Sequence, residues 1–330
     1  MASGSVRRAL ISATAVVVGS LCASGGAHAQ AYPNRPVTLV VGQAAGGTSD
    51  IFARLFAQAL TSKFGTVVVE NVSGAGGTIA ATRVARANPD GHTVLLGSSG
   101  INAIAYSQYN ELSYKPEDFV PVAHIVNTWI VVAARKSLGV KTMDEFIALA
   151  KARPNEITMG HTGKGQTTHL VCLLLEQAAG IKLRMVPYRG GGEALNAVLG
   201  GSIDGVCSGV PGIGSNILAN EVVGLAVGGA ERIDMIADTP SATDIKLPGL
   251  AAPVWIAVFA PKGTSPEIVK KLNAALREAM ADPTLVEALR RTGSSVPPEG
   301  QRSVEALDQL VSSEIKRWAA VLERAGATKE

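Results

Sequence analysis

The chain has 330 residues, of which 47% are hydrophobic and 17% charged, with 30 basic and 27 acidic residues. This near balance, without a basic cluster, argues against a nucleic-acid-binding protein. After the N-terminal segment no stretch approaches the ~20 unbroken apolar residues of a membrane-spanning helix, and the length favours two domains over one.

Residues 1–29 have the pattern of a secretory signal peptide. Arg7 and Arg8 precede an apolar run, and Ala27-His28-Ala29 places small residues at the cleavage position. The run is too short to span a membrane, so an uncleaved N-terminal anchor is the disfavoured alternative. We therefore predict export. Cleavage would remove two arginines and no acidic residue.

Short β-branched runs alternate with helical periods through most of the chain, which predicts an α/β fold with largely parallel sheets. Strands are predicted at 37–41, 66–70, 93–97, 120–124, 130–134, 157–160, 184–187, 205–208, 224–228 and 255–259. Helices are predicted at 49–60, 78–87, 142–152, 167–179 and 193–200, and in the C-terminal third at 265–280, 283–292 and 304–325.

Two apolar extended runs, 129–134 and 254–259, flank a self-contained α/β block. If the chain crosses between lobes at each run, lobe one is 30–131 plus 253–330 and lobe two is 132–252. Two lobes joined by two crossings form a hinged clamp, and ligands bind in the cleft between such lobes.

The most informative turn follows the first predicted strand and reads Gly42-Gln43-Ala44-Ala45-Gly46-Gly47, before a helix that we expect Thr48, Ser49 or Asp50 to cap. Such a turn directs unpaired N–H groups and the positive end of a helix dipole at one point, where small anions bind. A P-loop would need a lysine that is absent here, which argues against an NTPase. For Asp50, helix capping and an ion pair with Arg54 are favoured over a ligand contact.

Similar glycine- and hydroxyl-rich turns follow other predicted strands, at 73–77, 98–100, 162–169 and 188–190. Ligands of open α/β sheets bind outside the carboxyl ends of strands, and small residues let them approach backbone N–H groups. Together these turns predict a small-anion cleft lined by both lobes. Packing beside its helix start is favoured for His169 over a ligand contact. Tyr188 offers a hydroxyl or an aromatic wall, and Arg189 is either solvated or balances a distal carboxylate.

Motifs for catalysis and cofactor binding are incomplete. No Gly-x-Ser-x-Gly elbow occurs, and Gly163-x-Gly165, like Gly74-x-Gly76, lacks the third glycine of a dinucleotide fingerprint. His161 and His169 have no partners at metal-ligand spacing. We therefore predict a protein that is not an enzyme and that uses no metal and no cofactor.

Two cysteines, Cys172 and Cys207, lie in apolar segments beyond the signal peptide. Export permits a disulfide, but their separation in sequence does not fix the distance between their Cα atoms. Buried free thiols are favoured, and pairing stays open.

Several motifs together resemble the tripartite tricarboxylate transporter receptors, also called Bug-type solute-binding proteins. They include Tyr32-Pro-Asn-Arg-Pro-Val37, Gly46-Gly47-x-x-Asp50-x-x-Ala53-Arg54, Val69-Glu-Asn-Val-Ser-Gly-Ala-Gly-Gly77, Pro89-Asp-Gly-His-Thr93, Asp118-Phe-Val-Pro-Val122, Gly163-x-Gly165-x-x-x-His169-Leu170, Val186-Pro-Tyr-Arg-Gly190, Leu199-Gly-Gly-Ser-Ile-Asp204 and Ala260-Pro-Lys-Gly263. The resemblance implies a periplasmic-binding-protein-like (type II) Venus flytrap in which backbone groups and ordered waters hold one carboxylate between 42–50 and the facing turns 162–169 and 188–190. Many members have a proline-rich turn before the Gly-Gly pair, so the Gln-Ala-Ala turn here should be roomier, with Gln43 able to hydrogen-bond.

These observations and the resemblance predict a periplasmic receptor that captures a small carboxylated anion, a di- or tricarboxylate or an aromatic acid, and delivers it to membrane transporter subunits. We expect a monomer. The alternatives are a loaded receptor that signals to a sensor kinase and, less favoured, a periplasmic enzyme acting on a carboxylated substrate. The predicted ligand-binding residues are Gln43, Ala45, Gly46, Gly47, Thr48, Ser49, Asp50, Ser73, Ala75, Gly76, Ser98, Ser99, Thr162, Gly163, Gln166, Thr167, His169, Tyr188, Arg189, Gly190 and Ser208.

Overall fold

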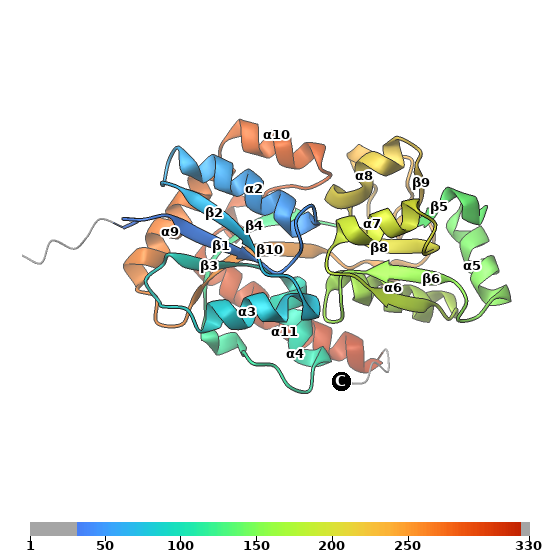
Figure 1. The fold of residues 1–330 in the computed structure, drawn as a ribbon, viewed down its shortest axis with the longest axis horizontal. Coiled ribbons are helices and arrows are strands. Elements are labelled where there is room, and N and C mark those ends of the chain that lie inside the picture. The colour runs from blue at the N-terminus through green and yellow to red at the C-terminus, as the bar shows by residue number, and fades with distance from the viewer. Residues whose placement is uncertain (1–31, 325–330) are drawn as a thin grey trace, which may run out of the picture. The chain divides into compact units, whose positions relative to one another are not determined.

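Two five-stranded sheets organise the protein, as the computed structural model shows for residues 32–324 (Figure 1). The predicted signal peptide, 1–29, lies outside the described residues. The sheet of the first lobe has the order β2-β1-β3-β10-β4, with β1 Val37–Val41, β2 Val67–Asn71, β3 Thr93–Ser98, β4 Phe119–Thr128 and β10 Val254–Pro261. The sheet of the second lobe has the order β7-β6-β8-β5-β9, with β5 Ile130–Arg135, β6 Thr158–His161, β7 Arg184–Pro187, β8 Gly205–Gly209 and β9 Val222–Val227.

In each sheet four of the five strands run in one direction, as the prediction of largely parallel sheets requires, but one antiparallel strand that was not predicted makes both sheets mixed. In the first lobe β1 pairs in parallel with β2 and β3, whereas β10 is antiparallel to β3 and β4. The second lobe repeats this pattern, with β6 parallel to β7 and β8 and with β5 antiparallel to β8 and β9. The antiparallel strands β5 and β10 enter their sheets from the other lobe, so no crossover helix within one sheet sets their direction.

The chain passes between the sheets at two places. β4 ends at Thr128 in the first sheet and β5 begins at Ile130 in the second, and the chain returns between β9 and β10. The lobe boundaries at 131/132 and 252/253 stay a prediction. Among the described residues, no helix is both long and apolar enough to cross a membrane.

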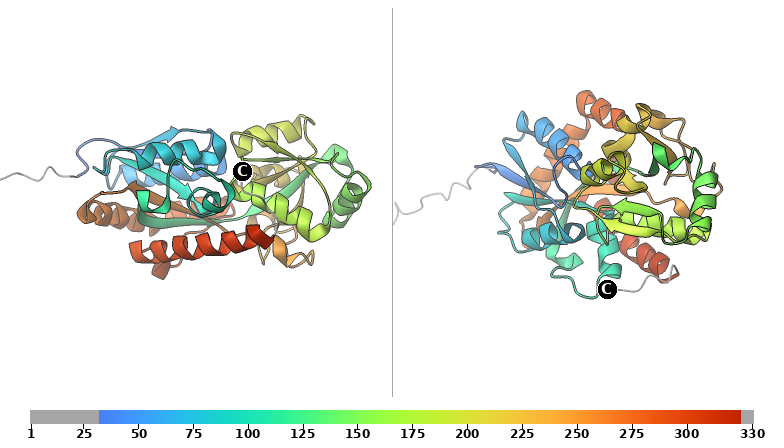
Figure 2. Two further views of the ribbon diagram at one scale, coloured as in Figure 1. Left: turned by 90° about the horizontal axis from the view of Figure 1, so that it is seen from below. Right: turned by 45° about the vertical axis from the view of Figure 1, so that its right-hand side comes forward.

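Helices cover both faces of the first-lobe sheet. They are α2 Thr48–Thr61, α3 Thr78–Ala85, α4 Ala105–Gln108, α9 Pro266–Met280, α10 Pro283–Arg291 and α11 Val304–Arg324. Side chains alternate along β10, so that Val258 faces α2 and α9 while Trp255 faces α11. Glu314 of α11 accepts hydrogen bonds there from the indole N–H groups of Trp255 (3.4 Å) and Trp318 (2.9 Å). Figure 2 shows α11, in red, running along one side of this lobe.

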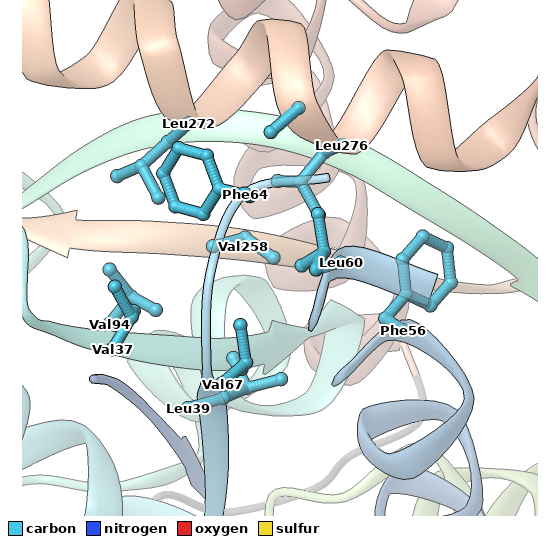
Figure 3. Close-up of a pocket in the computed structure, with 11 residues that line it drawn as sticks. Val37, Leu39, Phe56, Leu60, Phe64, Val67, Val94, Val258, Leu272 and Leu276 are labelled. Carbon is cyan, nitrogen blue, oxygen red and sulfur yellow. The ribbon is translucent and has the colours of Figure 1, made fainter. Parts of the chain in front are cut away.

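An apolar space lies between this sheet and the helices α2 and α9 (Figure 3). Eleven apolar residues line it, among them Phe56 and Leu60 of α2 and Leu272 and Leu276 of α9. A space without a hydrogen-bond donor offers nothing to an anion, so it belongs to the core of the lobe.

The second lobe has helices α5 Met143–Ala152, α6 Thr167–Ala179, α7 Gly191–Leu199 and α8 Val210–Leu218. Helices α7 and α8 pack on one face of its sheet through a buried cluster that includes Leu195, Val206 and Ile213. Helix α8 was not predicted, because Pro211, Gly212 and Gly214 give its segment a low helix propensity.

A disulfide joins α6 to the opposite face of β8. Cys172 and Cys207 have a Cα–Cα distance of 6.1 Å, within the range that a disulfide requires. The expectation of free thiols is therefore wrong. The packing of α6 against β8 brings together two residues that are 35 positions apart in the sequence.

The remaining short helical segments are connectors. They are the 3₁₀ turns Ala75–Gly77, Pro116–Asp118, Lys136–Leu138, Asp234–Ile236, Pro248–Leu250 and Glu299–Gln301, and the π-helical turn Gly100–Ile104 that leads into α4. Two of them, Ala75–Gly77 and Gly100–Ile104, lie on the side of the first lobe that contacts the second.

Candidate functional site

A narrow cavity lies between the two sheets, where residues of both lobes meet. The first lobe contributes Gln43, Thr48, Ser49, Ser98, Thr128, Val254 and Ile256, and the second contributes Ile130, Thr162, Gln166, Thr167, Thr168 and Gly209. All of these side chains are neutral, and most carry a hydroxyl or amide group. A ligand in this cavity would therefore meet dipoles and hydrogen-bond donors, without a charged side chain in the lining.

The helices that begin around the cleft receive no side-chain cap from the residue at their N-cap position. Helices α2, α6, α7 and α8 have Gly47, Gln166, Gly190 and Gly209 at their N-cap positions, and none of these side chains accepts a hydrogen bond from the first turn. Helix α3 begins the same way, after Gly77. The first-turn N–H groups have no acceptor within their own helix, and they carry the positive end of the helix dipole. Several such ends around one cleft favour a bound anion.

The start of α2 differs from the prediction that Thr48, Ser49 or Asp50 caps it. The N-cap is Gly47, and the Oε1 atom of Gln43 accepts a hydrogen bond from the Ser49 N–H at 3.1 Å. Gln43 does hydrogen-bond, as predicted, but its partner is the helix itself. It satisfies one N–H group of the first turn and leaves the helix with fewer donors for a ligand.

Asp50 has a structural role at this turn. Its carboxylate accepts hydrogen bonds from the Gly46 N–H (2.9 Å), from Arg54 Nε (2.9 Å) and from Asn71 Nδ2 (2.9 Å). Burial alone would raise the pKa of Asp50, but these three hydrogen bonds and the Arg54 charge hold it below its usual value. The ion pair with Arg54 agrees with the expectation, and the carboxylate tightens the turn that precedes α2.

On the second lobe, Thr162 and Thr168 fix the turn before α6. The Thr162 N–H donates to Thr168 Oγ1 at 3.0 Å, and the two hydroxyl groups lie 2.7 Å apart. Next to them, Thr167 Oγ1 lies 2.9 Å from Ser99 Oγ of the first lobe, and both residues are buried. Two residues predicted from separate turns, Ser99 and Thr167, thus join the lobes directly.

A set of contacts around α4 also holds the lobes together, and we call it the interlobe clasp. Gln108 accepts from the Gly165 N–H at 2.8 Å, and its amide nitrogen lies 3.0 Å from His169 Nδ1. Tyr109 donates its hydroxyl to the Lys164 carbonyl at 2.9 Å. The clasp therefore consists of Gln108 and Tyr109 on the first lobe and the 164–169 segment on the second.

Glycine permits the closest approach of the two lobes. Gln166 donates from Nε2 to the Gly76 carbonyl, and a Cβ atom on Gly76 would lie 2.1 Å from the Lys164 carbonyl oxygen. Gly76 also has a positive φ of 62°. Only glycine meets both conditions without displacing the backbone of the other lobe.

The two histidines near the cleft are neutral. Their ring centroids lie 4.5 Å apart with the planes tilted by 34°, and both residues are buried. Burial, together with the Lys164 charge and against the opposing hydrogen bond with the Gly163 N–H, lowers the pKa of His161 to about 4. Burial, His161 and Lys164 lower the pKa of His169 to about 3. His169 belongs to the clasp, which agrees with the expectation that it packs beside its helix start.

The mouth of the cleft is wider and carries charges. It is lined by Gly42, Gly74, Ala75, Gly76, Gly77, Tyr109, Thr162, Gly163, Lys164, Pro187, Tyr188, Arg189 and Glu193. The Ala44 N–H donates across it to the Arg189 carbonyl at 3.3 Å. The second-lobe turn at Tyr188 and Arg189 therefore faces the turn that precedes α2.

The remaining predicted residues divide between the periphery of the site and its interior. Ala45 and Gly46 are exposed, Ser73 is half-buried, and none of the three lines the cavity or its mouth. Gly190 packs near Ala44 of the first lobe. Ser208 lies in the interior, at the end of β8 and behind Gly209.

Some lining residues were missed by sequence reasoning. Thr128, Ile130, Val254 and Ile256 lie at the two crossings between lobes, which the apolar runs indicate but which we did not assign to the site. Gln108 and Tyr109 carry no local motif, because their partners lie 55 or more positions away. Within residues 32–324, no group of three or more His, Cys, Asp or Glu side chains is placed to hold a metal ion.

Comparisons with known proteins agree with this geometry. Residues 52–327 match the family model described as "Tripartite tricarboxylate transporter family receptor". The solved structure of the periplasmic binding protein BugD is 34% identical, with a TM-score of 0.87, and the match covers 91% of this chain and 100% of that chain.

Two solved structures from Rhodopseudomonas palustris hold dicarboxylates. MatC (Rpa3494), with bound malate, is 35% identical with a TM-score of 0.85, over 88% of this chain and 100% of that chain. Rpa4515, with adipate, is 33% identical with a TM-score of 0.85, over 89% of this chain and 98% of that chain. These similarities confirm the predicted two-lobed α/β fold of a binding protein.

Proposed function

Because the chain belongs to the tripartite tricarboxylate transporter receptor family, we propose that it captures a small carboxylated anion in the periplasm and delivers it to the membrane subunits of such a transporter. The observation that carries this proposal is the set of uncapped helix starts around a cleft lined by neutral donors. Backbone N–H groups at helix N-termini bind anions without a cationic side chain. The dicarboxylates held by MatC and Rpa4515 support the ligand class.

Capture and release follow from the two-lobed architecture. A ligand that contacts both lobes binds the closed arrangement more tightly than an open one, so it shifts the population toward closure. The direct contacts between Ser99 and Thr167 and within the clasp form part of the closed arrangement. The loaded and closed form is the one that we expect the transporter subunits to recognise.

The test is a thermal-shift screen of the purified protein with di- and tricarboxylates, aromatic carboxylates and matched amides. We expect one or more carboxylates to raise Tm because they bind only the folded state, by mass action, and we expect the matched amides to have no effect. Native mass spectrometry before and after ligand exchange would identify a retained ligand by its mass. A flat response across the whole panel would refute the proposal.

Two controls separate binding from other activities. We expect the shift to persist in EDTA, since backbone donors rather than a metal hold the anion, and loss of the shift on chelation would point to a metal site. Prolonged incubation of the bound carboxylate should return it unchanged by mass. A product of altered mass would instead show an enzyme.

A further inference from the structure

One buried hydroxyl in the second lobe lacks a hydrogen-bond partner. Ser208 is fully buried, and its Oγ atom is among the few buried side-chain polar atoms of the described residues for which no partner is found. Burying a hydroxyl without a partner is unfavourable, so a native protein rarely keeps one unless something else uses it. Alanine would occupy the same position at the end of β8 without burying a hydroxyl.

The position of this hydroxyl is set by β8. Val206 and Ser208 point to the face covered by α7 and α8, while Cys207 points to α6 and forms the disulfide. Because Ser208 is the second-last residue of the strand, its hydroxyl lies where α7 and α8 begin, instead of under their middle turns.

Glycines leave the space in front of this hydroxyl free of side chains. A Cβ atom added at Gly191, the first residue of α7, would lie 3.1 Å from Ser208 Oγ. One added at Gly212, in the first turn of α8, would lie 3.7 Å from Ser208 Oγ and 3.4 Å from Thr48 Oγ1. Thr48 lines the interlobe cavity, as does Gly209 beside Ser208. The hydroxyl therefore lies beside two residues that line the cavity, Thr48 and Gly209, and next to the first turns of α7 and α8.

We propose that Ser208, with the first turns of α7 and α8, forms a subsite for the second carboxylate of a dicarboxylate ligand. The inference rests on the proposed function and names the residue that distinguishes a dicarboxylate ligand from a monocarboxylate ligand. A serine hydroxyl donates one hydrogen bond, and the first turn of α7 adds N–H donors. In α8 the Val210 N–H donates to the Trp129 carbonyl and Pro211 has no N–H, so this helix adds the Gly212 N–H and its positive dipole end. An anionic acceptor fits all of these groups. A methyl group, as in a monocarboxylate of equal length, would leave Ser208 unpaired.

The test compares wild type with Ser208→Ala by calorimetric titration of matched pairs of equal chain length: succinate against butyrate, glutarate against pentanoate, and adipate against hexanoate. For Ser208→Ala we expect about ten- to a hundredfold weaker binding of the preferred dicarboxylate, the loss typical of a hydrogen bond to a charged group. Binding of the matched monocarboxylate should stay within twofold. The Tm without ligand should stay the same or rise, since the variant removes a hydroxyl that has no partner.

A second variant reaches the same subsite from the other side. Gly212→Ala fits beside Thr48 and Ser208 at ordinary contact distances and favours the helix, so its Tm should not fall. Its methyl group fills the space in front of Ser208 and should also reduce the preference for dicarboxylates. Ser265→Ala is the matched control: this hydroxyl caps α9 by accepting from the Ile268 N–H, so its loss should lower Tm and leave the preference unchanged.

The outcomes separate this inference from the proposed function. If wild type binds no carboxylate of the panel, the proposed function fails and the inference fails with it. If wild type binds carboxylates but Ser208→Ala weakens both members of a pair equally, or neither, the subsite is refuted and the carboxylate receptor stands. A selective loss for the dicarboxylate supports the subsite.

Discussion

The helices of this protein begin in two different ways, according to where they begin. Away from the cleft, α5, α9 and α10 are capped by Thr142, Ser265 and Asp282, whose side-chain oxygens accept from first-turn N–H groups. Around the cleft, α2, α3, α6, α7 and α8 begin at four glycines and a glutamine, and none of these residues forms a side-chain cap. A cap contributes about 1 kcal/mol to stability, so the uncapped starts give up stability and keep donors available. Side-chain caps therefore stabilise helices away from the cleft, whereas the helix starts around the cleft leave backbone N–H groups for the ligand that we propose.

The largest expected effect comes from keeping the lobes apart. In Gly76→Ala the new methyl group would lie 2.1 Å from the Lys164 carbonyl, so the first and second lobes cannot approach as they do here. We expect carboxylate binding to weaken at least about a hundredfold, because contacts made only on closure are lost. Titration calorimetry measures the affinity.

Gly139→Ala is the control for Gly76→Ala. Gly139 also has a positive φ, 81°, but its Cβ would meet nothing within 4 Å. This variant carries a similar backbone strain without the clash, so it should lower Tm while the affinity stays within about twofold. Equal losses of affinity in the two variants would show that strain, and not the approach of the lobes, is responsible.

A pH series tests the environment of an uncapped helix start, because His169 lies in the first turn of α6. The pKa of His161 falls to about 4 and that of His169 to about 3, both below the ordinary value of 6.5. Between these values and 6.5 the unfolded chain binds protons that the folded chain does not. Stability is therefore full above about pH 6.5 and falls as the pH is lowered, by up to about 1.4 kcal/mol per pH unit for each histidine.

Urea unfolding at pH 7, 6 and 5 measures this dependence. His169→Gln keeps a side chain that can accept from Gln108 but does not titrate, so it should reduce the slope. His161 and His124, whose pKa values burial also lowers, should account for the rest. The same slope in wild type and variant would mean that His169 does not contribute.

Adding a side-chain cap to a helix start at the cleft should raise stability and weaken carboxylate binding. Gly190 has an extended φ of −169°, so Gly190→Asp can adopt the N-cap conformation of α7 and accept from its first turn. We expect a small gain in stability, a few tenths of a kcal/mol, and roughly tenfold weaker carboxylate binding from repulsion and lost donors. Gly190→Ala, which crowds Ala44 in the same way without a carboxylate, isolates the capping effect.

Removing a cap far from the cleft should have the smallest effect on binding. Thr142→Ala deletes the hydroxyl that accepts from the Glu145 N–H at the start of α5 and should cost about 1 kcal/mol of stability. Carboxylate affinity should stay within about twofold. A clear loss of affinity in this variant would show that the two kinds of helix start are not functionally distinct.

Local sequence patterns predicted the parts of this protein that local chemistry determines. Strand–glycine–helix turns identified Gly42–Asp50 and the 162–169 segment, because a buried strand followed by a glycine and a helical period is recognisable within about twenty residues. The turn at Gln43 was identified, but the partner of its amide was not, because several acceptors and donors compete there.

Features that depend on distant partners could not be read from the chain. Strand direction in β5 and β10 is set by the passage between lobes, and pairing of Cys172 with Cys207 by the packing of α6 on β8. The clasp at Gln108 joins segments that share no pattern. Nothing in the sequence distinguishes Ser208 from an ordinary buried serine, because the lack of a partner is a property of three-dimensional packing.

The uncapped helix starts also bear on how such a receptor can change over time. A donor that belongs to the main chain is present whichever side chain its residue carries, with proline, as at Pro211 of α8, the one exception. Most single substitutions therefore leave it in place, whereas Lys→Ala would delete an ammonium group. Other substitutions change only the side chains in front of these N–H groups or next to them. Under the proposed function, the main-chain contacts to a carboxylate would be inherited with the fold, and substitutions at positions such as Ser208 and Gly212 would set which carboxylate is bound.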